Sequence, residues 1–144
     1  MIYLLDTNAC IKYLNGQSDS IRQRLDATRP QDIVVCSVVK AELFYGAMKS
    51  RDPVTNLAKQ RHFLQRFVSL PFDDRAAEAY GRTRAALERS GQLIGPNDLL
   101  IAAIAVAHNV TLVTHNTREF QRVDGLSIED WEAASTSTET RRTP

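Results

Sequence analysis

The sequence predicts an α/β domain with a central, mainly parallel sheet of four to five strands. Short apolar runs typical of buried strands alternate with longer segments of helical length. Prolines, glycines and helix-capping residues separate these segments, and no internal repeat or long linker divides the chain. A chain of 144 residues, 43% of them hydrophobic, is long enough for one sizeable core but too short for two ordinary domains.

The first predicted strand is the continuous apolar run at residues 2–5, as expected for a strand buried on both faces. The Asp-Thr-Asn sequence at 6–8 follows it, and these residue types commonly cap helices. We therefore expect a short helix through Leu14. A second, amphipathic helix is expected from about residue 18 to residue 27.

The next strand is predicted at residues 33–36, which are rich in β-branched side chains. Ser37 has the character of an N-cap for a helix over residues 38–48. Pro53 then opens a further helix, because proline suits a first helical turn, and this helix is expected to run to about Phe67.

Residues 68–71 form a weak third strand candidate. Asp73 or Asp74 is expected to cap a helix that ends at Gly91. The Gly-Pro pair at 95–96 opens the next helix, which is apolar nearly all round and is therefore expected to be central.

A buried strand is predicted at residues 111–114, and residues 126–128 can add a short edge strand. Parallel strands with helical crossovers account for the whole pattern. We expect residues 1–133 to form a single domain and the polar residues 134–144 to form a disordered tail.

The composition says more about the cellular compartment of the protein than about the class of its binding partner. The net charge is +1, with 18 basic and 17 acidic residues interspersed, so a nucleic-acid surface requires local clustering. Cys10 and Cys36 lie in apolar stretches, which favours two buried thiols over a disulfide. No signal peptide is visible, and the longest near-apolar stretch, 99–107, falls short of the roughly 20 residues needed to span a bilayer. We expect a soluble cytoplasmic protein without a membrane partner.

Three carboxylates lie within or at the ends of predicted core elements, where burying an unpaired carboxylate is energetically disfavoured. Asp6 ends the first strand, at the edge of a parallel sheet where ligands collect. Glu42 lies about one turn into the helix after the second strand, on one face with Ala41 and Tyr45. Asp98 opens the apolar helix.

Each of these acids also has a purely structural alternative. Asp6 can cap a helix, and this role is compatible with ligand binding. Glu42 can be a boundary residue paired with Lys or Arg, and Asp98 can interact with the helix dipole, worth about 0.5 kcal/mol. Glu119, after the strand at 111–114, can reach back toward the strand end or lie in an exposed turn.

Taken together, the acids predict a divalent cation and chemistry on phosphate. Carboxylates gathered within a few ångströms raise one another's pKa unless a positive charge is present. The candidate ligands are all oxygen donors, which suits Mg²⁺ or Mn²⁺ rather than Zn²⁺. Such ions polarise phosphodiesters and lower the pKa of bound water.

Four motifs carry a resemblance to a known family. They are Leu5-Asp6-Thr7-Asn8, the segment 37–43 (SVVKAEL), the segment 96–103 (PNDLLIAA) and the segment 112–120 (LVTHNTREF). Their order and spacing over residues 1–133 resemble the PIN-domain ribonucleases and, within them, the VapC toxins of type II toxin–antitoxin pairs. Together with the ending at 125–131, the motifs resemble the branch that cuts initiator tRNA in the anticodon loop.

The resemblance implies a three-layer α/β/α domain and a Mg²⁺- or Mn²⁺-dependent endoribonuclease that inhibits translation. Asp6 and Asp98 would bind the principal ion, and Glu42 would complete the ligand set or orient the attacking water. The fourth family acid is often Asp, whereas this chain has Glu119. The longer side chain would support a second ion, or the waters of the first.

Further residues are expected around this site. Hydrogen bonds that fix the carboxylates are expected from Thr7, Asn8, Ser37, Thr114 and Asn116. Candidates for RNA phosphate contacts are Lys40, Lys49, Arg51, Arg84, Arg118 and Arg122. For the helical hairpin at 38–67, the resemblance adds a homodimer surface and a groove for a VapB-type antitoxin, whose tail would obstruct the acidic pocket.

Two other functions remain open from the residues alone. Asp6 could be a phospho-acceptor. Aspartyl-phosphate hydrolases, however, need a second Asp two residues later, where this chain has Asn8. Receiver modules need an acidic pair before the acceptor strand, which an acceptor at residue 6 does not allow. A catalytically silent PIN-like binding module is the other alternative, and the intact Asp6, Glu42 and Asp98 argue against it.

Overall fold

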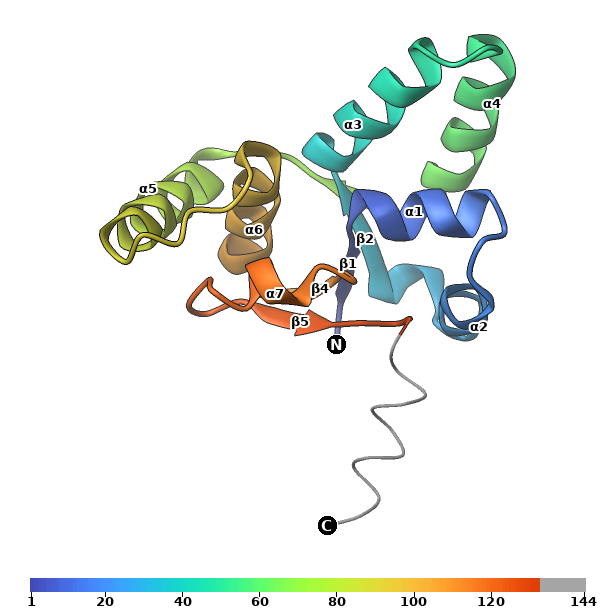
Figure 1. Cartoon of the computed structure of the whole chain (residues 1–144). Helices are drawn as coiled ribbons and strands as arrows, with labels where there is room; N and C mark the ends of the chain where they lie inside the picture. The colour runs from blue at the N-terminus through green and yellow to red at the C-terminus, as the bar shows by residue number, and fades with distance from the viewer. Residues whose placement is uncertain (133–144) are drawn as a thin grey trace.

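The computed structural model describes residues 1–132, which form a five-stranded parallel sheet between layers of helices (Figure 1). The strands are β1 (Tyr3–Leu5), β2 (Ile33–Cys36), β3 (Val68–Leu70), β4 (Thr111–Val113) and β5 (Ser127–Glu129). Their spatial order is β3-β2-β1-β4-β5, and every neighbouring pair is parallel. The predicted α/β/α fold class is confirmed.

Helices cover the two sides of the sheet. They are α1 (Thr7–Leu14), α2 (Asp19–Ala27), α3 (Ser37–Met48), α4 (Pro53–Leu64), α5 (Asp74–Arg89), α6 (Pro96–His108) and α7 (Thr117–Phe120), with a 3-10 turn at Pro30–Asp32. In Figure 1, α5 and α6 lie together on the left, whereas α1, α2 and the α3–α4 hairpin lie on the right. None of the described helices is long and apolar enough to cross a membrane.

The core is formed by the central strands and α6. All four residues of β2 are buried, and so is the run Ile101–Ala105 on α6, as its apolar composition predicts. Trp131, near the end of the described residues, is 1% exposed and packs edge-on against Tyr3. Cys10 and Cys36 are buried and free, which agrees with the prediction of two thiols.

Several predicted helix ends are confirmed in detail. Asp6 caps α1, as its residue type predicts, through a side-chain oxygen that accepts a backbone N–H. Ser18, at the predicted start of the second helix, caps α2 in the same way, a role that was not predicted. Asp73, rather than Asp74, caps α5. Gly91 follows the end of α5 with φ of +68°, a left-handed conformation that glycine adopts without steric cost.

Other boundaries differ from the prediction. Ser37 is the first residue of α3, and Cys36 occupies the N-cap position without a side-chain cap. The reason is that β2 runs directly into the helix, so the last strand residue keeps its extended backbone. The α4 helix ends at Leu64 rather than Phe67, because the chain must turn before β3 begins at Val68. The short helix α7 was not predicted.

The strand order reverses beside β1. The chain passes from β1 to β2 and β3 on one side, and then returns to place β4 on the other side of β1. In open parallel sheets, ligands bind at such a switch point, beyond the carboxyl ends of the strands. The topology therefore predicts a ligand site at the carboxyl ends of β1 and β4. The predicted tail at 134–144 lies outside the described residues.

Candidate metal centre

Asp6 lies at the switch point itself. It follows β1, and its backbone N–H donates to the carbonyl of Val113 at the end of β4 (3.1 Å). Asp6 is 7% exposed, and Thr114, the residue after β4, is 1% exposed. Two parallel strand ends thus place a carboxylate and a hydroxyl side by side in a largely desolvated position.

Burial raises the pKa of Asp6, which is the largest effect on this carboxyl group. A backbone hydrogen bond from Ala9 to Oδ1 (2.8 Å) and the nearby Thr114 hydroxyl act in the opposite direction. The negative charges of Glu132 and Glu42 raise the pKa further. Asp6 therefore combines its predicted capping role with an incompletely compensated negative charge.

Glu42 is half-buried on α3 and is held by two neutral donors. The Thr7 hydroxyl donates to Oε1, and the Asn97 amide nitrogen donates to Oε2 (3.1 Å). Thr7 begins α1 and Asn97 lies in the first turn of α6, so the carboxylate bridges two helix starts. No Lys or Arg in the described part of the chain forms an ion pair with Glu42. The alternative of a charge-paired boundary residue is therefore not supported.

Asp98 shows that the predicted acids lie close enough to interact. Its pKa is raised to about 6, first by burial and then by the negative charges of Glu42, Glu119 and Asp6. These groups come from four separate elements, namely the end of β1, α3, α6 and α7. The fold therefore brings the four predicted carboxylates into one acidic site.

Glu119 is half-buried on the short helix α7. The Asn116 amide nitrogen lies 3.4 Å from its Oε1, and the Asn116 backbone N–H donates to the Thr114 hydroxyl (3.0 Å). This chain of contacts links Glu119 to the end of β4. An exposed turn, the structural alternative for this residue, does not describe it.

The predicted supporting residues divide into two groups. Thr7, Thr114 and Asn116 each approach a carboxylate of the site. Asn8 and Ser37 are exposed, and in the described structure neither forms a hydrogen bond to the four acids. Asn97 was missed by the sequence analysis, although it lies inside the 96–103 motif beside Asp98.

The oxygen ligands fit a hard divalent cation. Four carboxylates raise the local negative charge, and neutral donors leave that charge uncancelled, which favours Mg²⁺ or Mn²⁺. The ligand atoms of the four acids are not drawn tightly together. Within residues 1–132, the group of three possible ligands whose atoms lie within 4.8 Å of one another is a different one, formed by His115, Asp130 and Glu132. The four acids are more widely separated than that.

The group of His115, Asp130 and Glu132 was also not predicted. His115 Nδ1 lies 2.9 Å from Asp130 Oδ2, and Lys12 Nζ lies 2.6 Å from Glu132 Oε1. These ion pairs join the end of the described chain to β4 and α1. Because Lys12 already neutralises Glu132, ion pairing is a sufficient explanation for this cluster.

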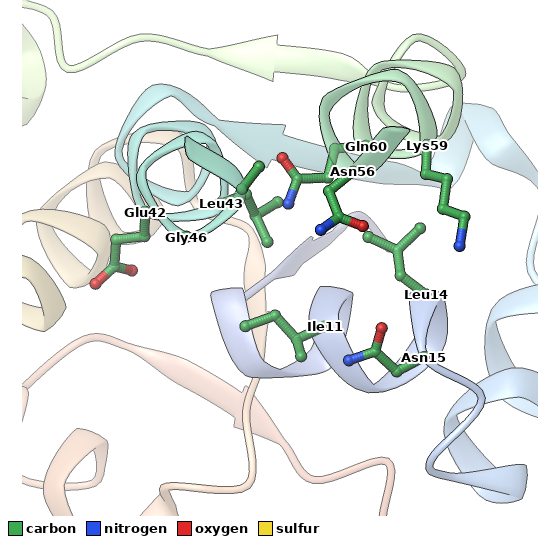
Figure 2. A pocket seen from close by; sticks show the side chains of 10 residues that line it. Ile11, Leu14, Asn15, Glu42, Leu43, Gly46, Asn56, Lys59 and Gln60 are labelled. Atoms are coloured by element: carbon green, nitrogen blue, oxygen red, sulfur yellow. The ribbon is translucent and has the colours of Figure 1, made fainter. Parts of the chain in front are cut away.

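A groove adjoins the acidic site on the side of α1, α3 and α4. It has a volume of about 260 Å³, and Figure 2 shows Glu42 at one end and Lys59 at the other. Apolar side chains of Ile11, Leu14 and Leu43 lie between them, while α3 and α4 contribute Gly46 and the amides of Asn56 and Gln60. The groove is therefore amphipathic, with opposite charges at its ends.

The predicted RNA-contact cations are distributed unevenly. Arg118 and Arg122 flank Glu119 in the sequence, and Lys40 is half-buried two residues before Glu42. Arg84 is engaged on α5, donating to Glu88 and to the Tyr80 hydroxyl. The remaining candidates, Lys49 and Arg51, are exposed around the end of α3.

Comparison with known proteins gives consistent matches over most of the chain. The PIN domain family model matches residues 3–126. Ribonuclease VapC2 of Rickettsia felis is 42% identical over 133 residues, covering 92% of this chain and 99% of that protein. The tRNA(fMet)-specific endonuclease VapC of Shigella flexneri is 42% identical over 129 residues, covering 90% and 97%.

Solved structures agree with these sequence matches. The crystal structure of VapBC2 from Rickettsia felis, bound to a promoter DNA fragment, contains a chain with a TM-score of 0.85 and 42% identity. It covers 91% of this chain and 99% of that chain. DNA-bound VapBC from Salmonella typhimurium gives a TM-score of 0.86 at 39% identity, covering 91% and 98%.

Proposed function

Because this chain belongs to the PIN-domain family and to its VapC ribonucleases, we propose that it is the toxin of a type II toxin–antitoxin pair. Its activity is endonucleolytic cleavage of RNA phosphodiesters, with initiator tRNA cut in the anticodon loop as the substrate. The observation that carries the proposal is the gathering of Asp98, Glu42, Glu119 and Asp6 from four separate elements, with Glu42 held by neutral donors and not by a Lys or Arg among the described residues. Such a gathering of acids is costly without a cation.

Mg²⁺ or Mn²⁺ is the proposed cofactor, held by Asp6 and Asp98, with Glu42 completing the ligand set. When bound, the ion polarises the phosphodiester and lowers the pKa of a coordinated water. Thr7 and Asn97 fix both oxygens of Glu42, so this carboxylate is positioned to orient a water molecule and accept its proton. Glu119, with the longer side chain, acts through a water molecule or supports a second ion.

The proposed partner is a VapB-type antitoxin that occupies the groove between α1, α3 and α4. The VapBC structures of relatives support such a partner. Because Glu42 ends this groove, a peptide lying in it would reach the acidic site and obstruct it. The exposed side chains of Tyr45, Met48 and Val54 on the α3–α4 hairpin supply an apolar surface for the proposed homodimer.

The test is cleavage of purified initiator and elongator tRNAs by the purified chain. We expect cleavage of initiator tRNA with Mg²⁺ or Mn²⁺, none with EDTA, and none by the Asp98→Asn variant. Cleavage that survives EDTA or this substitution would contradict the metal-dependent mechanism. Cleavage of every tRNA at the same rate would contradict only the initiator assignment.

The catalytically silent alternative has its own test in cells. We expect expression of the chain to arrest growth, and the Asp6→Ala variant to relieve the arrest. Equal arrest by both would favour a binding module that acts without catalysis. The phospho-acceptor alternative has lost its support, because Asp6 Oδ1 caps α1 and the relatives are ribonucleases.

A further inference from the structure

A second groove lies between α5, α6 and the turn after α7, and it shares no lining residue with the groove in Figure 2. It has a volume of about 460 Å³ and is lined by residues from α5, from the segment that joins α5 to α6, from α6 and from the turn after α7. Its polar lining consists of Arg82, Thr83, Ser90, Gln92, Arg122 and Asp124. Two arginines and several neutral hydrogen-bonding groups therefore face one hollow.

The two arginines are placed differently. Arg82 is exposed on α5, and among residues 1–132 it forms no hydrogen bond or ion pair. Arg122 is half-buried, and its Nη1 lies 3.4 Å from the backbone carbonyls of Gln92 and Leu93. Contacts to carbonyls orient this guanidinium without neutralising it. Both positive charges thus remain available to a ligand.

The lining carries an excess of positive charge. Asp124 is the acidic residue among the groove residues, and its charge is smaller than that of the two arginines together. A guanidinium forms paired hydrogen bonds with phosphate oxygens, and hydroxyl or amide groups bind phosphate and ribose oxygens. This combination of groups matches a nucleic-acid backbone better than a neutral small molecule.

One turn of the chain connects the groove to the acidic site. Arg122 lies three residues after Glu119, and its backbone N–H donates to the Glu119 carbonyl (3.1 Å). Such a turn keeps the two Cα atoms within about 7 Å, which is roughly two stacked nucleotides at 3.4 Å each. On the other wall, Gln92 leads through a short segment to Asp98. Arg122 is therefore within reach of a strand that is cut at the acids and continues past α7.

We propose that this groove binds the phosphates of the RNA strand flanking the cleaved bond, with Arg82 as its main phosphate contact. This inference rests on the proposed ribonuclease function and extends it to a residue outside the predicted RNA contacts. Arg122 and the Thr83 hydroxyl complete the subsite. The groove supplies binding and register, whereas the acids supply the chemistry.

The experiment measures binding of fluorescent initiator tRNA to the full-length chain in an Asp98→Asn background, by fluorescence anisotropy over a range of KCl concentrations. Arg82→Gln is expected to weaken binding about tenfold and to reduce the salt dependence by about 0.7, the value for one phosphate contact on a single strand. Arg82→Lys should recover most of the affinity, because it keeps the charge. Asp124→Asn should tighten binding about twofold to threefold.

Arg61→Gln on α4 is the matched control, because it removes one exposed arginine outside the groove and is expected to change little. With Asp98 intact, Arg82→Gln should raise KM for tRNA cleavage and leave kcat unchanged. Equal affinities of Arg82→Gln and Arg61→Gln, in a chain whose wild type cleaves tRNA, would overturn the groove assignment alone. Failure of the wild type to cleave would overturn the proposed function, on which this inference rests.

Discussion

The charge of Asp98 should destabilise the metal-free protein, so its removal should stabilise it. Burial and the charges of Glu42, Glu119 and Asp6 raise the pKa of Asp98 from 3.8 to about 6. Between pH 4 and 6, the folded carboxyl group keeps a proton that the unfolded chain has released. The free energy of unfolding therefore falls as pH rises through this window, and the full penalty is present above it.

The size of this penalty follows from the shift. A change from 3.8 to about 6 corresponds to about 3 kcal/mol if the group were fully shielded from solvent. Asp98 is only half-buried, and solvent screening reduces the value to about 1–2 kcal/mol. We therefore expect Asp98→Asn to raise the melting temperature by about 3–6 °C at pH 7.5, and to have little effect below pH 4.

Thermal unfolding in EDTA, followed by circular dichroism at both pH values, measures this effect. Asp124→Asn is the matched control, because Asp124 is exposed and lies outside the acidic site. Added Mg²⁺ should stabilise the wild type more than Asp98→Asn, since a ligand stabilises the state that binds it. A variant no more stable than the wild type at pH 7.5, or equally stabilised at both pH values, would refute the electrostatic argument.

Three further predictions concern other parts of the molecule. Thr7→Val should lower the single-turnover cleavage rate about 10- to 100-fold by freeing Glu42, whereas Thr7→Ser should retain activity. Glu119→Gln should also lower the single-turnover rate, but it should retain at least ten times the rate of Asp98→Asn, because Glu119 is proposed to act through a water molecule or on a second ion; equal rates for the two variants would make Glu119 a direct ligand of the principal ion. A chain ending at residue 133 should keep its stability in urea unfolding. A chain ending at residue 130 should lose about 3–5 kcal/mol, because Trp131 is 1% exposed and packs edge-on against Tyr3; equal urea midpoints for the two truncated chains would refute the domain boundary.

Local sequence signals were sufficient for most of the fold. Buried parallel strands appear as uninterrupted apolar runs, and Asp6 and Asp73 mark helix starts through their capping side chains. Ser37 misled the prediction because its residue type suits an N-cap, while β2 leads straight into α3 and leaves that position to Cys36. Residue type indicates a capping preference, but the tertiary path of the chain decides which residue fills the position.

The candidate site was predictable in its acids but not in the groups that hold them. Asp6, Glu42 and Asp98 stand out because each carboxylate is attached to an apolar element. Asn97 has no such contrast, because an asparagine in a first helical turn is ordinary. Its role depends on α6 approaching α3, a contact between residues 55 positions apart in the sequence. Such donors are visible only once the fold is known.

The choice of neutral donors has a physical consequence for this site. A lysine or arginine paired with Glu42 would remove the repulsion felt by Asp98, but it would also cancel the charge that attracts a divalent cation. Thr7 and Asn97 instead fix the direction of the carboxylate and leave its charge in place. The site is therefore ordered before the ion binds, while the repulsion among its acids remains. That remaining repulsion is the same quantity that the Asp98→Asn experiment measures, so stability in EDTA and affinity for Mg²⁺ should change in opposite directions across substitutions of the four acids.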